Sequence, residues 1–391
     1  MKQSLLSKIV RSVLWRTGIG RKTAEWFWHN RSEGVGFELL RYREENVFDE
    51  LPTLFDSPEY SSFIKADNKH NTRQAEYVVA IDNVLVEPER LLGIRSGREV
   101  VEQTVVYKWD RQYPYILPYL LHPRQPEALP IAMLYDGSAT RNYYHHFVDA
   151  LSQLTLLPQA AVPKNIPLLI TRAMYEMPFF QYLYQRSAFF KGMNWRIVEP
   201  GEWLQVKKLY KIQAMQWDTS TWRQMRAIYE LPDSRPTRRV FLNRDSRYVG
   251  RYLSNESEVE AMLHRHGFET VFAERLSMAE QAQLFQETEY LVALTGAGLI
   301  QQFFMNPQYG HVIEVMPANR LMPEYYWQGF KLGMHYYDVV VGGSMAIREG
   351  KDYAMNVDTL EAAVVRMLTN TSLTATYGRT VMPTIAHGLN V

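Results

Sequence analysis

The chain has 391 residues, of which 46% are hydrophobic and 22% are charged, and its formal net charge is +1. This composition is that of a soluble globular protein long enough for two domains, and the near-neutral charge gives no global attraction to nucleic acid. The absence of cysteine excludes disulfides, zinc sites with thiolate ligands and a cysteine nucleophile. No apolar run approaches the roughly 20 residues that a membrane-spanning helix needs.

Residues 1–30 predict a basic amphipathic helix. Six lysines and arginines precede the first acidic residue, Glu25, and the segment lacks the apolar centre and cleavage site of a signal peptide. Two interpretations stay open, a helix lying on an anionic membrane surface and a helix packed on its own domain. The apolar residues recur with the spacing of one helical face: Leu5, Leu6, Ile9, Val10, Val13 and Leu14.

Residues 31–225 predict an N-terminal α/β domain. Short apolar segments are typical of strands, and the longer segments between them have helical periodicity. In chain order the expected elements are a strand at 131–135, a helix at 143–157, a strand at 167–171, a helix at 178–190 and a strand at 195–200.

The expected helix 143–157 carries candidate catalytic residues. Asp149 is four residues from His145 and three from His146, so on a helix its carboxylate can neighbour either imidazole. A carboxylate beside a histidine orients the ring and raises its basicity, which suits removal of a proton from a hydroxyl. Asp149 and His146 are therefore candidate catalytic residues, and the alternative is a structural histidine. Adjacent histidines point about 100° apart on an α-helix, so they are poor joint ligands for a metal.

The segment 217–239 contains prolines and polar residues that interrupt both periodicities. Residues 236–391 after it predict a second, Rossmann-like domain, because strands and helices alternate as in doubly wound α/β proteins. We expect N-caps at Asn255 and Ser277 and a helix end at Gly267. The elements are strands at 238–243, 268–273, 290–294 and 311–315, and helices at 254–267, 278–288, 299–305 and 356–368.

The sequence Gly296-Ala297-Gly298 lies between the expected strand 290–294 and the next helix. Free amides and the helix dipole favour an anion there, and glycine lets a phosphate approach the backbone. The alternative is a tight turn that needs glycine only for packing. Gln301 stands where a dinucleotide-binding fingerprint has its third glycine.

Three arginines, Arg244, Arg247 and Arg251, follow the strand 238–243 at what we expect to be the same edge of the sheet. Guanidinium groups can grip a diphosphate bidentately and stabilise its charge as a bond to it breaks. The alternative is a solvated basic loop balanced by Asp245 and Glu256. The chain has no Asp-x-Asp pair, which is common in sugar transferases that hold the donor through a divalent ion. We therefore expect arginines and amides as the countercharge, with no metal.

Residues 238–317 resemble the core of glycosyltransferase family 61. That core has a strand with Arg, a second Arg, Asn-Glu, a helix containing Gln, then Gly-Ala-Gly-Leu, a short helix and a Val-x-Glu strand. The segment NYYHHFVDAL, residues 142–151, also resembles the upstream Asn-x-x-His…Asp segment of the family. The family usually has His before Gly-Ala-Gly, whereas this chain has Thr295, whose hydroxyl cannot carry a positive charge.

The resemblance implies a GT-B-like α/β fold, with two Rossmann-like domains facing each other across a cleft. It also implies inverting transfer from a nucleotide-sugar donor, and it places the N-terminal domain, with His146 and Asp149, on the acceptor side. We expect no cofactor besides the donor itself. Around the donor we expect Asn243, Arg244, Arg247, Asn255, Glu256, Gln281, Thr295, Gly296, Ala297, Gly298 and Glu314.

Bacterial members of the family are often linked to capsular or other surface polysaccharide. We therefore expect a sugar to be moved to a surface polysaccharide, lipopolysaccharide or glycolipid acceptor, at the cytoplasmic face of the inner membrane, with no nucleic-acid partner. One alternative is a catalytically inactive scaffold that binds nucleotide or glycan, which the departure at Thr295 keeps open. Another is a nicotinamide-dependent oxidoreductase, against which the missing third glycine counts.

Overall fold

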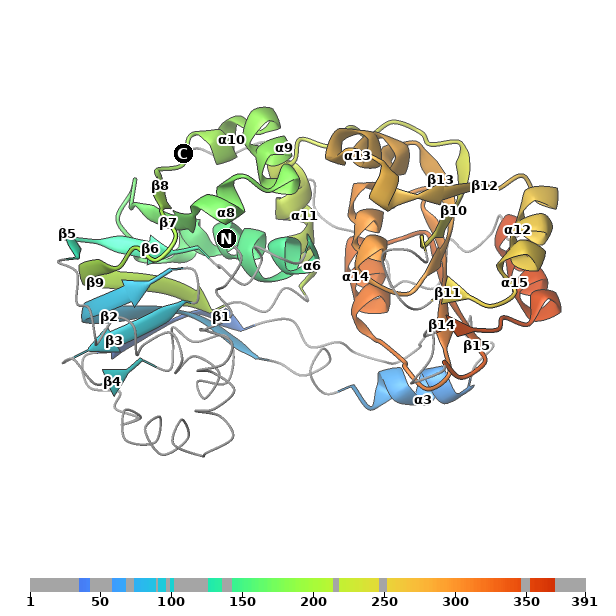
Figure 1. The fold of residues 1–391 in the computed structure, drawn as a ribbon, viewed down its shortest axis with the longest axis horizontal. Helices are drawn as coiled ribbons and strands as arrows, with labels where there is room; N and C mark the ends of the chain where they lie inside the picture. The colour runs from blue at the N-terminus through green and yellow to red at the C-terminus, as the bar shows by residue number, and fades with distance from the viewer. Residues whose placement is uncertain are drawn as a thin grey trace, which may run out of the picture. The chain divides into compact units, whose positions relative to one another are not determined.

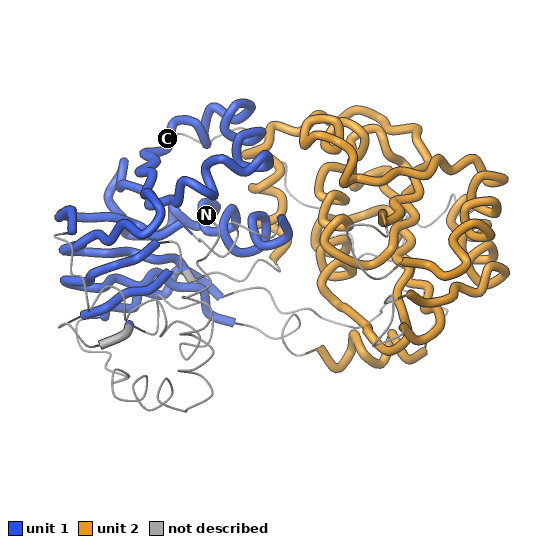
Figure 2. The backbone as a smooth tube through the Cα atoms, viewed as in Figure 1, with its two compact units in different colours: residues 1–43, 74–216 blue, residues 44–73, 217–391 orange. Residues whose placement is uncertain are grey.

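The computed structural model describes residues 35–42, 58–67, 74–88, 91–95, 99–101, 126–135, 143–213, 218–245, 252–345 and 352–369. The expected helix 1–30, Arg247 and Arg251 lie outside these residues. The chain forms two compact units (Figure 2): unit 1 contains residues 1–43 and 74–216, and unit 2 contains residues 44–73 and 217–391.

Unit 2 is built on a five-stranded sheet in which every pair is parallel. Its strands are β10 (Arg238–Asn243), β12 (Glu269–Phe272), β13 (Thr288–Leu294), β14 (His311–Pro317) and β15 (Tyr336–Gly342). The spatial order is β12-β10-β13-β14-β15, which is the 2-1-3-4-5 order of a doubly wound sheet. The predicted parallel α/β arrangement of this half is thus confirmed.

Helices cover both faces of this sheet (Figure 1). On one face lie α12 (Glu256–Arg265) and α15 (Val357–Thr369). On the other lie α13 (Met278–Gln286), α14 (Glu324–Leu332) and a 3₁₀ helix (Ala297–Phe304), with α11 (Thr219–Ile228) packed on α14. Smaller elements of the unit are α3 (Pro58–Lys65), a 3₁₀ turn (Ala273–Arg275) and the parallel pair β11 (Tyr252–Leu253) and β16 (Asp352–Tyr353).

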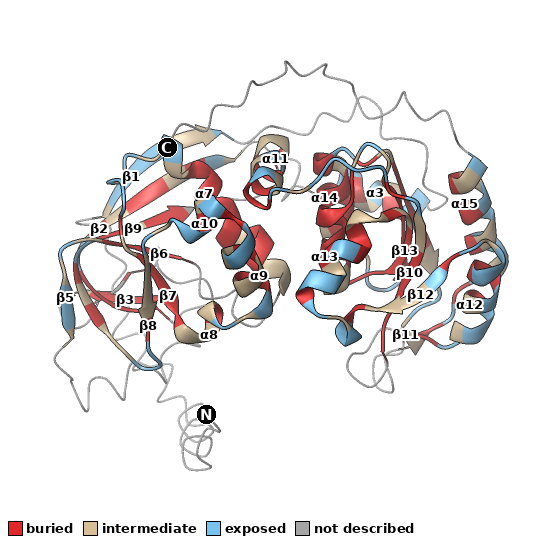
Figure 3. Ribbon diagram, turned by 90° about the horizontal axis from the view of Figure 1, so that it is seen from above, coloured by how far each residue is buried: buried red, intermediate tan, exposed pale blue. Residues whose placement is uncertain are grey.

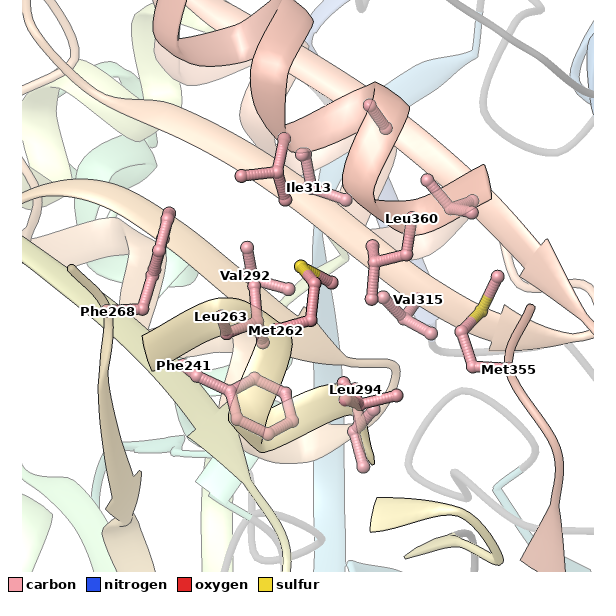
Figure 4. Close-up of a cluster of buried hydrophobic side chains, with 14 of the residues drawn as sticks. Phe241, Met262, Leu263, Phe268, Val292, Leu294, Ile313, Val315, Met355 and Leu360 are labelled. Carbon is pink, nitrogen blue, oxygen red and sulfur yellow. The ribbon is translucent and has the colours of Figure 1, made fainter. Parts of the chain in front are cut away.

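The core under α12 and α15 explains why these sequences form a layered domain. Alternate residues of the strands, among them Val292, Ile313 and Val315, point toward apolar residues of the helices, including Met262 and Leu360 (Figure 4). All five side chains are at most 1% exposed. Helix α14 is buried over most of its length (Figure 3), because it lies between the sheet and further helices.

The helix ends of unit 2 match the sequence signals in part. Ser277 and Glu280 form the predicted capping box at the start of α13, with bonds of 2.7 and 3.3 Å between each side chain and the other residue's amide. Gly267 ends α12 with φ of +80°, in the left-handed region that favours glycine. Asn255 occupies the N-cap position of α12, but its side chain does not cap the helix.

Unit 1 contains a mixed sheet in the order β4-β3-β2-β9-β6-β7-β8, with β1 also on β2 and β5 also on β9. Its strands are β1 (Val35–Tyr42), β2 (Ala75–Glu87), β3 (Leu92–Arg95), β4 (Glu99–Val100), β5 (Glu127–Leu129), β6 (Ala132–Leu134), β7 (Leu168–Thr171), β8 (Trp195–Val198) and β9 (Leu204–Gln213). β6, β7 and β8 are the predicted parallel strands. The antiparallel part, β1 to β4 with β9 on β2, departs from a Rossmann-like unit.

The helices of unit 1 differ from the two long helices expected. They are α6 (Tyr143–His145), a π-helix (His146–Leu151), α7 (Ser152–Leu156), a 3₁₀ turn (Leu157–Gln159), α8 (Arg172–Tyr175), α9 (Pro178–Arg186) and α10 (Ala188–Lys191). The predicted helix 178–190 is broken because Ser187 is extended and its hydroxyl accepts the Phe190 amide at 3.2 Å, capping α10.

Candidate functional site

The carboxyl ends of β10 and β13 lie side by side in the sheet of unit 2. The two strands pair directly and end at Asn243 and Leu294. In this strand order they flank the point where the winding direction of the sheet reverses, and ligands of open α/β sheets bind in the crevice beside such a point. Arg244 follows the first strand and the glycine loop, residues 295–298, follows the second.

Arg244 packs directly against Gly296. A Cβ atom built on Gly296 would lie 1.4 Å from Arg244 Nη2 and 2.5 Å from Cζ, and Gly296 has φ of +144°. Only glycine combines this conformation with room for the guanidinium group. At Gly298, by contrast, a Cβ would meet only Leu242 Cδ2 at 3.5 Å. The prediction that Arg244 lies at the glycine loop is therefore confirmed. Gly296 leaves the space in which the Arg244 guanidinium packs against the loop backbone.

Two main-chain amides of the glycine loop are open, in the sense that no described residue accepts a hydrogen bond from them. The Thr295 amide donates to the Val315 carbonyl (2.8 Å) and the Leu299 amide donates to Gly296 (2.8 Å). Between them, the amides of Ala297 and Gly298 make no hydrogen bond within the described part of the chain. They begin the 3₁₀ helix, and the first N–H groups of a helix have no intrahelical acceptor. The Arg244 guanidinium and these two amides thus form a cluster of hydrogen-bond donors.

The Arg244 side chain is largely withdrawn from water, since the residue is only 8% exposed. Burial lowers its pKa from the ordinary value, Arg320 lowers it further, and Tyr325, Tyr353 and Glu274 oppose the decrease. Arginine has an ordinary pKa above about 12, so the group stays charged at neutral pH. A cation in such surroundings interacts more strongly with an anion than one in bulk water.

Asn243 orients the backbone that carries Arg244. Its Nδ2 donates to Glu256 Oε1 at 2.6 Å and to Glu260 at 3.3 Å, while its Oδ1 accepts the Arg244 amide at 2.8 Å. Asn243 is 1% exposed. This network ties the end of β10 to the first turn of α12, so Asn243 and Glu256 belong to the framework around Arg244.

Asn255 has a different role from the predicted cap. Its Oδ1 accepts the Met355 amide at 3.0 Å and its Nδ2 donates to the Met355 carbonyl at 2.8 Å. The side chain therefore fastens the start of α12 to the segment after β16, one hundred residues later in the chain.

Gln281 also makes structural contacts. Its Nε2 donates to the carbonyls of Ala273 (2.9 Å) and Leu276 (3.0 Å), and its Oε1 accepts Gln301 Nε2. Gln281 thus connects α13, the turn after β12 and the 3₁₀ helix that follows the glycine loop.

Glu314 lies on β14 and is fully buried. Its Oε2 accepts the Tyr337 hydroxyl at 2.8 Å, while Oε1 has no hydrogen-bond partner among the described residues. Burial raises the pKa of Glu314 to about 8, against the opposing effects of the Thr295 and Tyr337 hydroxyls. The Thr295 hydroxyl points to Met322 Sδ, 3.9 Å away. The structure therefore holds the Glu314 carboxyl inside the sheet of unit 2, where burial favours its protonated form.

In unit 1, Asp149 pairs with His145. Asp149 Oδ2 lies 2.5 Å from His145 Nδ1, and the two side chains are 32% and 34% exposed. His146 lies on another side of the helix, is 0% exposed, and neither ring nitrogen has a hydrogen-bond partner among the described residues. It packs on Phe179 with ring centroids 4.6 Å apart, and burial lowers its pKa to about 3. The expected orientation of His146 by Asp149 is therefore not formed.

The π-helix accounts for this arrangement. It runs from His146 to Leu151, and its i→i+5 hydrogen bonds make the turn wider than the α-helical turn on which the sequence argument depended. Single π-helical turns are frequent at functional sites. The wide turn leaves Asp149 and His145 partly exposed as a pair while His146 enters the core.

Sequence reasoning missed Arg320 and Tyr60. Arg320 follows the end of β14 much as Arg244 follows the end of β10, and this chain-order pattern could have identified it. Tyr60, on α3, is fully buried in unit 2 and its hydroxyl donates to the Met322 carbonyl at 2.9 Å. No signal in the sequence near Tyr60 predicts this contact across 262 positions.

The residues described contain no group of three or more histidine, aspartate or glutamate side chains placed to hold a metal ion. Within the same residues, every helix is too short or too polar to cross a membrane.

Residues 143–313 match the family described as Glycosyltransferase 61, a range that contains both the His145–Asp149 pair and the Arg244–Gly296 contact. A search of curated proteins found no match to the chain.

Proposed function

Residues 143–313 carry a glycosyltransferase 61 domain, and we propose that the protein is an inverting glycosyltransferase that uses a nucleotide-sugar donor. The observation that carries this proposal is the packing of Arg244 on Gly296 beside the two open amides of Ala297 and Gly298. Together they offer charge and directed hydrogen bonds to a nucleoside diphosphate leaving group.

In the proposed reaction, the bond between the anomeric carbon and the donor diphosphate breaks as an acceptor hydroxyl attacks from the opposite side. Negative charge grows on the departing phosphate oxygen. Donors fixed in advance at that position lower the barrier, because they need no reorganisation during the reaction. Arg244 and the amides of Ala297 and Gly298 supply these donors without a metal ion.

Asp149 is the base in this proposal. It receives the proton of the acceptor hydroxyl as the new glycosidic bond forms, so the proton ends on the carboxylate and the electron pair on the diphosphate. The His145–Asp149 contact of 2.5 Å supports this choice, because the imidazole can orient the carboxylate. His146 is a weaker candidate, since burial lowers its pKa to about 3.

The proposed pairing of the two units is the GT-B arrangement, with Asp149 and Arg244 facing one cleft. The support is the resemblance of residues 238–317 to the family core. An experimental structure with a bound nucleoside diphosphate tests the pairing, and a diphosphate turned away from Asp149 would rule it out.

We also propose a surface polysaccharide or glycolipid as acceptor, and a position at the cytoplasmic face of a bacterial inner membrane. The support is the basic segment 1–30, which in the sequence leads into strand β1. On β1, Phe37 is 53% and Leu39 51% exposed, and Tyr42 is 52% exposed. Exposed apolar groups that follow a basic segment in the sequence suit contact with an anionic bilayer. Transfer to peptide acceptors but never to glycans or glycolipids would contradict this choice.

A thermal-shift panel of nucleoside diphosphates and nucleotide sugars tests the function, because a ligand that binds the folded state raises the melting temperature. We expect at least one nucleoside diphosphate to stabilise the protein and Arg244→Gln to lose the shift. The alternative is a catalytically inactive scaffold, which the presence of Thr295 in place of His leaves open. Slow hydrolysis of the matching nucleotide sugar that depends on Arg244 would show that the protein is an enzyme. A panel without any stabilising nucleotide would refute both.

A further inference from the structure

The loop 318–323 follows β14 at the carboxyl edge of the unit 2 sheet and is held from two sides. The Asn319 side chain makes two hydrogen bonds with the Met345 backbone, each 2.9 Å long. On the other side, the Tyr60 hydroxyl of α3 donates to the Met322 carbonyl at 2.9 Å. Arg320 lies between these anchors, so the backbone that carries it is fixed.

The same loop contacts the glycine loop. Met322 Sδ lies 3.9 Å from the Thr295 hydroxyl, and Thr295 precedes Gly296, on which the Arg244 guanidinium packs. The contacts therefore connect the backbone of Arg320 to the place where Arg244 meets the open amides.

The two arginines differ in exposure and act on each other. Arg320 is exposed and makes no ion pair with any carboxylate of the described residues, whereas Arg244 is 8% exposed. Burial is the main cause of the lowered pKa of Arg244, and the positive charge of Arg320 adds a small further decrease. Cations whose charges interact repel each other, and a bound anion reduces this unfavourable interaction.

We propose that Arg320 binds the second phosphate of the donor diphosphate, while Arg244 and the amides of Ala297 and Gly298 bind the first. This inference rests on the proposed function. A planar guanidinium can bind two oxygens of one phosphate at once. A diphosphate offers one phosphate to the buried Arg244 and the other to the exposed Arg320. Arg320 thereby distinguishes a nucleoside diphosphate from a nucleoside monophosphate.

The test is calorimetric titration of the full chain with nucleoside mono- and diphosphate pairs that share a base, and with phosphate and pyrophosphate. The variants are Arg320→Gln, Arg320→Lys and Arg244→Gln. Arg265→Gln is the matched control, because Arg265 is an exposed arginine in the last turn of α12. A helix that follows a parallel strand ends at the edge of the sheet opposite to the carboxyl ends of the strands, so Arg265 lies away from the candidate site. A melting curve for each variant checks that it is folded.

We expect Arg320→Gln to weaken diphosphate binding about 10- to 100-fold, the effect of a charged hydrogen bond. Monophosphate binding should change by less than about threefold, with Arg320→Lys in between and Arg265→Gln like the wild type. Equal weakening of both ligands, or an unchanged preference for diphosphate in Arg320→Gln while Arg244→Gln loses binding, would overturn this inference and leave the proposed function standing. Failure of the wild type to bind any probe would overturn both.

Discussion

Replacement of Gly296 by alanine separates the role of the arginine contact from that of the glycine loop as a whole. The new Cβ would stand 1.4 Å from Arg244 Nη2, and the residue has φ of +144° and ψ of −177°. The guanidinium must move, and the backbone conformation is one that essentially only glycine adopts.

The structure sets the size of both effects. Holding alanine in this conformation costs about 1–3 kcal/mol, which lowers the melting temperature of a unit this large by a few to about 10 °C. Displacing Arg244 removes a charged hydrogen bond worth about 1.5–3 kcal/mol, so nucleoside diphosphate binding should weaken about 10- to 100-fold.

Gly36→Ala is the matched control, because Gly36 lies on β1 of unit 1, its added Cβ would meet only Ala80 at 3.8 Å, and its φ does not require glycine. We expect this variant to melt and bind nearly as the wild type does. The assays are thermal melting and titration with the nucleoside diphosphate that binds best. Wild-type binding by Gly296→Ala, or equal losses in both variants, would refute the reasoning.

Three further changes test other parts of the molecule. Asp149→Asn should lower sugar transfer by at least about 100-fold, the usual contribution of a general base, while nucleoside diphosphate binding in a titration stays close to wild type; retained turnover would contradict its role. Burial raises the pKa of Glu314 from 4.5 to about 8, so between these pH values the folded state binds a proton that the unfolded state releases, and stability falls as pH rises through this window. The free energy of unfolding, measured with urea, should therefore fall between pH 5 and pH 8 by about 3–5 kcal/mol less in Glu314→Gln than in the wild type. Identical pH dependence of the two proteins would show that the carboxyl is ionised in the folded state. Replacing Phe37 and Leu39 with serine should reduce co-sedimentation of the protein with anionic vesicles, because exposed apolar groups contribute to binding at a bilayer surface. A wild-type protein that binds neither anionic nor neutral vesicles would remove the membrane proposal.

Local signals predicted much of unit 2. The strand 238–243 and the capping box of Ser277 and Glu280 occur as expected, because apolar runs and cap residues act through neighbours a few positions away. The same locality explains the failure at Asn255. Its amide forms bonds with Met355, and no local pattern reports a partner so distant in the chain.

In unit 1 the local patterns were less informative. The helical periodicity around Asp149 was correct, yet it did not distinguish an α-helix from the π-helix that selects His145 over His146. The break at Ser187 depends on one hydroxyl that caps the next helix. The antiparallel strands β1 to β4 were not predicted, because their formation depends on pairing with strands elsewhere in the sequence.

For the candidate site, the sequence identified the elements but not the roles of all their residues. Arg244 and Gly296 were predicted to meet because parallel strands end at one edge of a sheet. Gln281 and Glu314 were expected around the donor, whereas the structure shows bonds to the protein itself. Whether any of these residues contacts a donor stays a prediction.

Helix α3 belongs to unit 2, although it precedes most of unit 1 in the sequence. The polypeptide leaves unit 1 after residue 43, contributes residues 44–73 to unit 2, returns, and leaves again after residue 216. Tyr60 reaches the backbone at Met322, and Asp67 accepts the Trp327 indole N–H at 2.9 Å. A fragment that starts at residue 217 would lack this helix and its hydrogen bonds to Met322 and Trp327. Unit 2 therefore depends on a segment that precedes residue 74, and a cut at residue 217 does not separate the two units.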